Sequence, residues 1–413
     1  MTTGWTESEN GRISPPADTL LRLGFSPETS FTLHDVAEGL LLRPVDPPLT
    51  RVYVEPTSAC NLSCRTCIRN SWSEATGTMS METYRRLIEG LREVPSLRKV
   101  SFWGFGEPLL HPHIVEMVAL AKGIGAQTQI VTNALLLDEE KAEGLVAAGL
   151  DSLVVSVDGA SAKVHADVHT GADLETVHRN LMVLRIARVR ARHDLEIGIE
   201  FVMMRRNVAE LPALPDLALS MGASFIVLTH LLPYTEELKD EILYGMDAGT
   251  CYFDHRSKWA PEVIMPRMDW RRELHEPLAK LFMRTKDNGI PRERRKGVSG
   301  YCRFVGEGSL AVAWDGQASP CVALMHSYSC FVHRRPKSIR RYRLGDIAQE
   351  SPSEIWGKEE YRRFRQRVDE FDFPPCTDCG GCQLAESNEE DCIGSPFPTC
   401  GDCLWAKGVI QCP

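Results

Sequence analysis

Three cysteines within eight residues are the part of this sequence with the clearest chemistry. They lie in the stretch Cys60-Asn-Leu-Ser-Cys64-Arg-Thr-Cys67, which follows an apolar, strand-like run at 51–55 and a Pro-Thr-Ser turn. A [4Fe–4S] cluster normally takes four thiolates, so three from one loop leave one iron without a protein ligand. An open position on a metal is where a substrate or cofactor binds, as in catalytic zinc sites. The spacing therefore indicates a catalytic iron–sulfur centre.

Two other uses of three close cysteines fit this sequence less well. A structural zinc site usually pairs two ligands with two more at a distance, and no partner pair follows within the next hundred residues. Disulfides need an oxidising compartment, and the start Met1-Thr-Thr-Gly-Trp5 lacks the basic and apolar regions of a signal peptide. We therefore expect a cytoplasmic protein whose fourteen cysteines mainly bind metal.

The composition is that of an ordinary globular protein. Apolar residues make up 43% and charged residues 25% of the 413 residues, which is enough chain for two or three domains. The net charge of −9 gives no reason to expect nucleic acid as a partner. No apolar run reaches the roughly 18 residues of a membrane span, so we expect no membrane partner.

Short β-rich runs alternate with amphipathic stretches between residues 51 and 232. The expected strands lie at 51–55, 99–103, 127–132, 152–157, 196–203 and 224–229, and the expected helices at about 80–93, 113–123, 138–148, 173–192 and 208–221. This alternation predicts a parallel βα sheet. Barrels of this kind bind ligands at the C-terminal ends of their strands. The residues that follow each strand should therefore form the site.

The spacing C-x3-C-x2-C resembles the signature of radical SAM enzymes. In that family the fourth iron binds the amino and carboxylate groups of S-adenosylmethionine (SAM), and one electron cleaves the sulfonium to give methionine and a 5′-deoxyadenosyl radical. The resemblance implies an α/β fold with a partial (β/α)6 barrel, and a catalytic, metal-binding role for Cys60, Cys64 and Cys67. It also implies an electron donor such as a ferredoxin or flavodoxin.

Three motifs after the expected strands extend this resemblance. Gly104-Phe-Gly106-Glu107 resembles the family's Gly-Gly-Glu motif, which holds the methionyl amine of SAM, and glycines allow the close backbone approach that this needs. Asn133, in Thr-Asn-Ala, is similar to the Asn of the family's Thr-Asn-Gly. Ser156, in Ser-Val-Asp-Gly, is similar to the serine that the family places near the ribose. Both side chains can offer hydrogen bonds to hydroxyl or carboxylate groups.

Two positions depart from the family pattern. The residue before the third cysteine is often an aromatic side chain that packs on the adenine, but here it is Thr66. Many relatives carry Arg-Gly after the fourth strand, where this chain has His169-Thr-Gly171. We expect His169 to be a surface residue and the isolated Cys251 to be an inert buried thiol.

A second cysteine-rich region follows a hairpin signal at Asp315-Gly316. It resembles a SPASM domain, the extension that binds auxiliary [4Fe–4S] clusters in many radical SAM enzymes. The resemblance implies nine candidate ligands: Cys302, Cys321, Cys376, Cys379, Cys382, Cys392, Cys400, Cys403 and Cys412. Two fully ligated clusters would use eight of them, and Cys330 lies off the pattern. One or two zinc ribbons are the alternative, because two of the C-x2-C pairs have zinc spacing.

The most specific resemblance comes from the C-terminal segment that begins Cys379-Gly-Gly-Cys382 and from Cys64-Arg-Thr-Cys67-Ile-Arg-Asn-Ser-Trp72. Both are similar to the radical SAM maturases associated with tungsten-containing aldehyde:ferredoxin oxidoreductases. This implies that the substrate is a pterin cofactor or its host oxidoreductase. An enzyme that crosslinks a ribosomally made peptide through thioether or carbon–carbon bonds is the first alternative. A non-catalytic iron–sulfur or zinc-binding electron-transfer protein is the second, and it would not cleave SAM.

The sequence suggests four segments. They are a leader or small β segment at 1–50, the radical SAM barrel at 51–232, a charged connecting region at 233–300 and a SPASM-like auxiliary cluster domain at 301–413. Within the first segment we expect a helical turn at 18–23 and two strands within 31–44. The basic helix expected at 358–368 is interpreted as a solvated face.

Overall fold

The structure is a computed structural model that describes residues 6–7, 12–22, 31–36, 39–44, 46–72, 74–245, 262–267, 272–284, 302–374, 376 and 382–412. Two cysteines of the sequence analysis, Cys251 and Cys379, lie outside the described residues. So does most of the expected connecting region.

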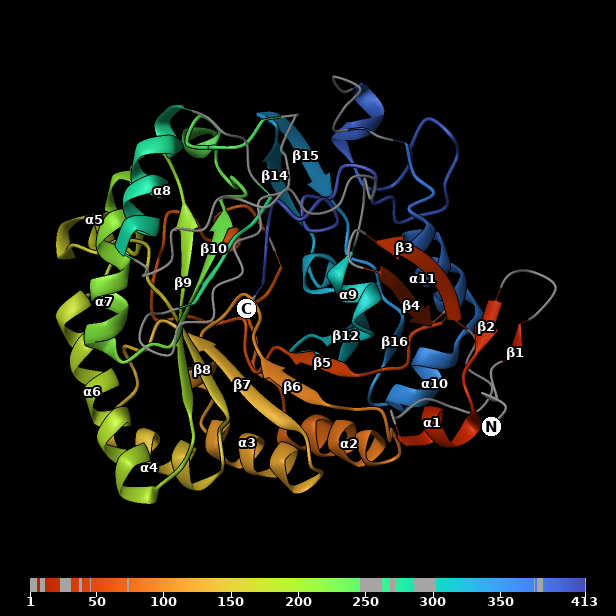
Figure 1. The fold of residues 1–413 in the computed structure, drawn as a ribbon, viewed down its shortest axis with the longest axis horizontal. Coiled ribbons are helices and arrows are strands. Elements are labelled where there is room, and N and C mark those ends of the chain that lie inside the picture. Colours follow the sequence, from red (N-terminus) through yellow and green to blue (C-terminus); the bar gives the residue numbers. More distant parts are fainter. Residues whose placement is uncertain are drawn as a thin grey trace.

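Six parallel strands in chain order form the barrel wall, as the alternation predicts (Figure 1). They are β5 (Arg51–Val54), β6 (Lys99–Phe102), β7 (Gln127–Thr132), β8 (Ser152–Ser156), β9 (Glu196–Met203) and β10 (Phe225–His230). The outer face is covered by α2 (Met81–Arg92), α3 (Ile114–Gly123), α4 (Glu139–Ala147), α6 (Leu174–Ala191) and α7 (Leu214–Met221). The positions expected for the strands are confirmed within two residues at each end.

The helical pattern needs two corrections. The stretch 208–221 is a 3-10 helix, η3 (Val208–Ala213), followed by α7, because Pro212 lacks the N–H that a continuous α-helix would use. A short helix outside the expected helix ranges, α5 (Ala162–Val168), lies between β8 and α6.

Alternation along β5 separates the outside of the barrel from its interior. Val52 and Val54 belong to the large apolar cluster under the helices. Tyr53 points the other way and packs with Phe304 and Ala311 of the C-terminal region. Successive side chains of a strand point to opposite faces, so C-terminal residues cover the inner face of the barrel at this strand.

The sheet continues beyond β5 into the cysteine-rich region. The expected hairpin is present as β12 (Ser309–Val312) and β13 (Gln317–Ser319), and β12 pairs parallel with β5. Strand β16 (Gly345–Asp346) follows, and β11 (Glu262–Ile264) extends the other edge beside β10. The described residues thus form one ten-stranded sheet that joins the barrel to the C-terminal region.

The remaining elements surround this sheet. The N-terminal segment forms α1 (Ala17–Arg22) and an antiparallel sheet of β1 (Thr6–Glu7), β2 (Arg12–Ser14), β3 (Phe31–Val36) and β4 (Gly39–Pro44), which confirms the expected helical turn and strand pair. The others are α8 (Arg272–Arg284), α9 (Arg303–Gly306), β14 (Tyr328–Val332), β15 (Arg335–Ile339), α10 (Pro352–Gly357), α11 (Glu359–Glu370) and short 3-10 turns. None of the described helices has the length and apolar character needed to cross a membrane.

Helix α11 is only partly the solvated basic face that its sequence suggests. Arg362 and Arg363 are exposed, but the side chain of Arg365 is 1% exposed and donates to the Asp46 carboxylate at 2.7 Å. Its guanidinium also lies over the ring of Trp356, 4.1 Å from the centroid. The interpretation was wrong for Arg365, because a long-range carboxylate and an aromatic face make burial of this cation favourable.

Candidate functional site

The cysteine loop leaves the C-terminal end of β5, where barrel ligands are expected to bind. Cys60, Cys64 and Cys67 are half-buried free thiols, and the 3-10 helix η1 (Ile68–Asn70) closes the loop. The side-chain amide of Asn70 donates to the carbonyl of Cys64 at 3.0 Å. The loop therefore has a fixed backbone that presents three thiols from one short segment.

Each of the three sulfur atoms lies within hydrogen-bonding distance of a nitrogen atom. The pairs are Leu62 N with Cys60 Sγ at 3.4 Å, His169 Nδ1 with Cys64 Sγ at 3.6 Å, and Arg69 Nε with Cys67 Sγ at 3.2 Å. Burial raises the pKa of Cys60 to about 11, so binding a metal there must release a proton. Thiols that face N–H groups are suited to carry the negative charge of cluster ligands, which supports an iron–sulfur cluster at this loop.

His169 is not the surface residue that the sequence analysis expected. It is 5% exposed, and its Nε2 lies 2.9 Å from Oδ2 of Asp158, which is 1% exposed. Burial lowers the pKa of His169, but Asp158 and Cys64 outweigh this effect and raise the pKa to about 10. The expectation was wrong because α5 folds back under the cysteine loop, where the backbone N–H of Arg65 donates to Val168 O at 2.9 Å.

A second histidine packs against His169. The ring of His165 stacks on it with centroids 4.7 Å apart, and its two nitrogens have no hydrogen-bond partner within the described part of the chain. Burial and the charge of His169 lower the pKa of His165 to about 4. Two histidines four residues apart on one helical face were a signal in the sequence that the analysis did not use.

The Gly104–Glu107 turn packs against the backbone just before Cys60. A Cβ on Gly106 would lie 2.0 Å from the carbonyl oxygen of Thr57, and the N–H of Glu107 donates to the carbonyl of Ala59 at 2.8 Å. Only glycine fits at position 106 without moving the backbone. The structure therefore brings this turn beside the cysteine loop, as the resemblance implies.

The carboxylate of Glu107 is used within the protein. It is 2% exposed and accepts hydrogen bonds from Thr132 Oγ1 at 2.7 Å and from Asn133 N at 2.9 Å. Burial raises its pKa, and these donors oppose the increase. Glu107 thus connects the ends of β6 and β7 and fixes Asn133.

Asn133 lies beside the cysteine loop. Its amide Nδ2 donates to Asn61 Oδ1 at 2.9 Å and lies 3.9 Å from Cys60 Sγ. Ser156, at the end of β8, is half-buried and stands opposite Glu200 of β9 in the sheet register. The cysteine loop and the ends of β6 and β7 are therefore in contact, and Ser156 ends the neighbouring strand.

Glu200 is a functional candidate that the sequence analysis missed. It is 8% exposed, and burial together with the nearby Asp158 raises its pKa to about 8. A carboxyl with such a shifted pKa near a binding site is a candidate for proton transfer or ligand binding. No local sequence signal distinguishes it, because it lies within an ordinary β-strand pattern.

A buried histidine joins the barrel to the C-terminal region. His326 Nε2 lies 2.8 Å from Glu55 at the end of β5, and Nδ1 lies 2.7 Å from Glu74 beyond the cysteine loop. The other oxygen of Glu55 accepts the N–H of Phe105 at 2.9 Å. Burial lowers the pKa of His326, but the two carboxylates outweigh it and raise the pKa to about 9. This charged group holds the Gly104–Glu107 turn against the C-terminal region.

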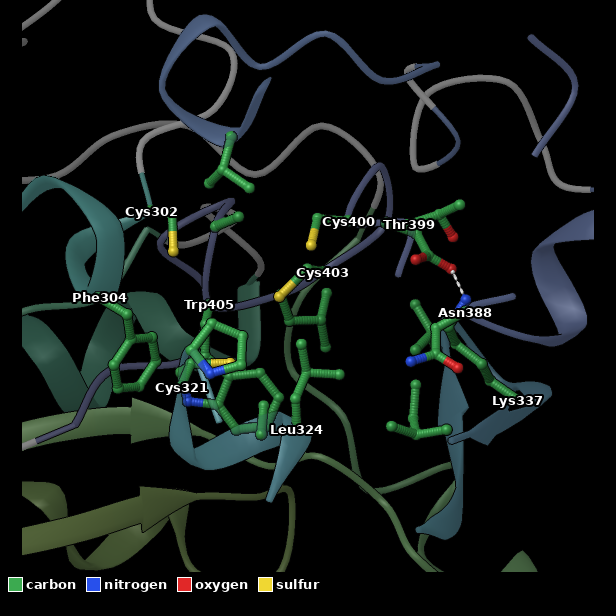
Figure 2. Close-up of a pocket in the computed structure, with 18 of the residues that line it drawn as sticks. Cys302, Phe304, Cys321, Leu324, Lys337, Asn388, Thr399, Cys400, Cys403 and Trp405 are labelled. Carbon is green, nitrogen blue, oxygen red and sulfur yellow. Dashed lines mark hydrogen bonds and ion pairs between the residues drawn. The ribbon is translucent and has the colours of Figure 1, made fainter. Parts of the chain in front are cut away.

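A cavity in the C-terminal region is lined by five cysteines: Cys302, Cys321, Cys330, Cys400 and Cys403. Figure 2 shows four of their sulfur atoms with Phe304, Leu324 and Trp405 around the same space. Burial raises the pKa of Cys321 well above its usual value, and Cys302, Cys403 and Cys400 raise it further. These four thiols form one group. Cys330, which the sequence analysis left out, lies at the edge of the same cavity.

Three further cysteines of the prediction form a second, more exposed group. Cys376 is half-buried, and Cys382 and Cys392 are exposed. Burial raises the pKa of Cys376 to about 11, and Cys392 and Cys382 are close enough to add to the increase. These three thiols are near enough to influence one another, and their role as ligands of one cluster stays a prediction.

Between the two groups lies a buried ion pair. Lys337 Nζ donates to Asp402 Oδ2 at 2.7 Å, and the two side chains are 5% and 9% exposed. The ammonium also donates to the carbonyl of Ser387 at 2.8 Å. Asp402 sits between Cys400 and Cys403, so this pair fixes the segment that carries two of the cavity thiols.

Cys412 is not among the residues that line the cavity, but it packs against the same apolar cluster as Cys302 and Cys321. Its sulfur accepts the indole N–H of Trp405 at 3.2 Å. Burial raises the pKa of Cys412, and the nearby Glu200 of the barrel raises it further. The N–H of Gln411 donates to Thr229 of β10 at 2.9 Å, and the C-terminus lies inside the curve of the sheet (Figure 1). The role of Cys412 as a cluster ligand stays a prediction.

All twelve cysteines in the described part of the chain are free thiols. Within that same part, no three His, Cys, Asp or Glu side chains converge tightly enough for a single metal ion. The fit of a cofactor is therefore judged from the type and grouping of the donors. Groups of thiols without histidine or carboxylate fit iron–sulfur clusters, and a set of four also fits zinc.

Two family models match this chain. A model described as the radical SAM superfamily matches residues 54–210, and a model described as an iron–sulfur cluster-binding domain (SPASM) matches residues 302–383. The first match contains the cysteine loop and the ends of β6, β7 and β8. The second contains the hairpin and the first cysteines of the cavity.

Curated proteins and solved structures show the same likeness. The chain is 27% identical over 370 residues to the tungsten-containing aldehyde ferredoxin oxidoreductase cofactor-modifying protein of Pyrococcus furiosus (88% of this chain, 96% of that protein). It is 31% identical over 374 residues to a PqqA peptide cyclase of Xanthomonas campestris pv. campestris strain B100 (89% and 88%). The crystal structure of Streptococcus suis SuiB bound to the precursor peptide SuiA has the same fold (TM-score 0.56, 13% identity, 88% and 76% covered).

Proposed function

This chain belongs to the radical SAM superfamily and carries a SPASM iron–sulfur domain, and we propose that it matures a tungsten-cofactor oxidoreductase by radical chemistry. The family models indicate iron–sulfur clusters and the use of SAM. The likeness to the P. furiosus cofactor-modifying protein spans nearly the whole of both chains, which supports this target. The substrate would be the pterin cofactor or the oxidoreductase that holds it.

The cysteine loop would hold the catalytic cluster through Cys60, Cys64 and Cys67. The observation that carries this assignment is that three thiols of one loop, at the barrel mouth, each face a nitrogen atom that can donate a hydrogen bond. When bound, the cluster and SAM supply the radical, because one electron added to the sulfonium breaks its bond to the 5′ carbon and leaves methionine. The loop backbone and its donors fix the thiolates and leave the fourth coordination position to SAM.

The chain's own residues would orient SAM at the ends of the barrel strands. The carbonyls of the Gly104–Glu107 turn would accept the methionyl ammonium, because the turn packs directly against the cysteine loop. Asn133 and Ser156 would bind carboxylate or ribose oxygens, and Glu107 would act through Asn133 rather than by touching SAM. Glu200, with its raised pKa, would face substrate or ribose from β9.

The C-terminal region would hold two auxiliary clusters, which together use eight thiolates. Cys302, Cys321, Cys400 and Cys403 would bind one, supported by their common cavity. Cys376, Cys382 and Cys392 would bind the other together with Cys379, which the sequence places between them. Cys412 is then the spare thiol. The auxiliary clusters would accept the electron that remains after hydrogen abstraction or would bind substrate directly.

Iron content and SAM cleavage test this function together. After anaerobic reconstitution we expect about twelve irons per chain, against about four if the C-terminal region binds zinc. With dithionite or a reduced ferredoxin or flavodoxin, the protein should form 5′-deoxyadenosine from SAM. Cys64→Ala should abolish this product while the irons of the C-terminal region remain. A Cys64→Ala protein that still cleaves SAM would show that the catalytic loop is misassigned.

Peptide modification is the second candidate. The PqqA peptide cyclase likeness at 31% identity over most of the chain, and the fold shared with a peptide-bound SuiB, favour it. A tungsten oxidoreductase produced without this protein would separate the two functions. If this chain is the maturase, adding that oxidoreductase should accelerate SAM cleavage and should yield an active oxidoreductase. No acceleration with either the oxidoreductase or its free pterin cofactor would favour a peptide substrate instead.

A further inference from the structure

His169 is held rigidly between a carboxylate and a cluster thiol. Its Nε2 lies 2.9 Å from Asp158 Oδ2 and its Nδ1 lies 3.6 Å from Cys64 Sγ. The second oxygen of Asp158 accepts the backbone N–H of Val202 at 2.7 Å, so the carboxylate itself is anchored to β9. The histidine is 5% exposed. Neither ring nitrogen is free to turn toward water.

The partners of the ring decide which nitrogens carry hydrogen. A carboxylate only accepts hydrogen bonds, so Nε2 donates to Asp158. A thiolate that ligates iron is also an acceptor, so both ring nitrogens face acceptors, and both must carry a hydrogen to satisfy them. In the imidazolium Nδ1 also carries a hydrogen, and that N–H points at the sulfur of Cys64.

We propose that His169, oriented by Asp158, donates a hydrogen bond to the Cys64 thiolate and thereby raises the reduction potential of the catalytic cluster. This inference rests on the proposed cluster site at Cys60, Cys64 and Cys67. Reduction adds one electron from a low-potential donor protein to the cluster, and no bond is broken or proton moved in that step. An N–H group that faces a ligating sulfur stabilises the added negative charge, as such hydrogen bonds do in other clusters.

The position of His169 gives this bond a consequence for the reaction. The histidine follows α5, and Asp158 lies two residues after Ser156, the residue proposed to bind SAM. The backbone of the cysteine loop also rests on this segment, through Ser63 N and Thr170 O at 3.3 Å. One segment therefore orients both the cosubstrate and the donor that makes the cluster easier to reduce.

The test is a redox titration of the reconstituted full-length protein, followed by electron paramagnetic resonance. The catalytic cluster is identified as the signal that changes when SAM is added. In His169→Phe, which keeps the ring and loses the donor, we expect at least a tenfold fall in the equilibrium constant for one-electron reduction. This fall corresponds to about 59 mV. The potentials of the auxiliary clusters should not change.

Three further variants separate a tuning role from a structural one. His169→Asn, whose amide places an N–H near the position of Nδ1, should restore part of the potential. His165→Phe alters the stacked neighbour but no hydrogen bond within the described residues, and should keep the wild-type value. If His169→Phe does not retain the cluster, Asp158→Asn takes its place, because that variant keeps the imidazole. Its catalytic cluster must then have a lower reduction potential than that of the wild type.

Two results would overturn the inference. The first is a wild-type reduction potential in a His169→Phe protein that has its full iron content. Where His169→Phe loses the cluster, a wild-type potential in Asp158→Asn counts in the same way. The second is an equal shift in His165→Phe. Absence of a SAM-sensitive cluster in the wild-type protein would instead refute the proposed cluster site, so the response of the wild-type signal to SAM distinguishes the two failures.

Discussion

Two of the thiol groups of this molecule, the cysteine loop and the C-terminal cavity, are built in opposite ways. In the cysteine loop the sulfurs are half-buried, and two of the three N–H groups that face them belong to the basic side chains of Arg69 and His169. In the C-terminal cavity the surroundings are mostly apolar, and the N–H groups near the sulfurs are backbone groups, such as those of Val305 and Phe304 at Cys302. Burial there raises the pKa of Cys302 to about 12.

This difference indicates different tasks. Basic donors beside a partly open loop stabilise a cluster that gains negative charge and must meet a ligand at its free iron. A buried, apolar cavity with four thiols leaves no iron open, as closed structural metal sites do. We infer that electron entry and SAM chemistry belong to the loop. The cavity would store charge and hold the C-terminal region together.

The largest expected effect comes from breaking the closed site. Cys403→Ala removes one of the four cavity thiolates, and we expect about four irons per chain to be lost. SAM cleavage by dithionite-reduced protein should continue, because the cysteine loop is untouched, whereas modification of the substrate should stop. Iron analysis and 5′-deoxyadenosine formation measure the two outcomes.

Cys330→Ala is the matched control for that variant. Cys330 lines the same cavity but is not among the four grouped thiols, so its removal should leave the iron content unchanged. If Cys330→Ala loses iron and Cys403→Ala does not, the grouping is wrong, and the closed site has a different fourth ligand.

The next effect concerns the open site. Gly106→Ala would place a Cβ 2.0 Å from Thr57 O and 2.6 Å from Ala59 O, and neither backbone oxygen can move without displacing the cysteine loop. We expect SAM binding to weaken by at least about tenfold, or roughly 1.4 kcal/mol, with the iron of the C-terminal cavity retained. Gly123→Ala is the control, because its Cβ would meet nothing within 4 Å. Equal SAM affinity in both variants would contradict the close packing of the turn.

Features encoded locally were predictable from the sequence. The six barrel strands and the hairpin follow from short β-rich runs, the amphipathic stretches between them and the turn residues, and the cysteine loop follows from its spacing alone. The positions of Gly106 and Asn133 beside that loop follow from one rule, that ligands of parallel sheets gather at the ends of the strands.

Features that depend on distant partners were not predictable. His169 and Cys64 are separated by 105 residues, and nothing in the local pattern of either residue indicates that they meet. Arg365 is buried because Asp46 faces it from the other end of the chain. Cys330 lies off the cysteine spacing, yet the pairing of β14 with β15 brings it to the cavity. In each case tertiary contacts override what composition suggests.

The last effect tests the junction between the two regions. Because the pKa of His326 is raised to about 9, above the ~6.5 of an unfolded chain, the folded state binds its proton more tightly. The contribution of protonated His326 to the stability of the folded state is therefore full below about pH 6.5 and is lost as the pH rises through about 9. The shift corresponds to at most about 3 kcal/mol, and screening at the partly exposed Glu74 reduces it to about 2 kcal/mol.

Anaerobic thermal unfolding of the holoenzyme between pH 6 and pH 9.5 measures this slope. His326→Gln should be less stable than the wild type at pH 6, because Glu55 loses its buried cation, and should show a flatter profile above pH 6.5. His113→Gln changes a histidine whose side chain is 54% exposed and should keep the wild-type slope. If His326→Gln retains that slope, the charged contact between barrel and C-terminal region contributes nothing to stability. The two thiol groups would then be joined by the β5–β12 pairing and apolar packing alone.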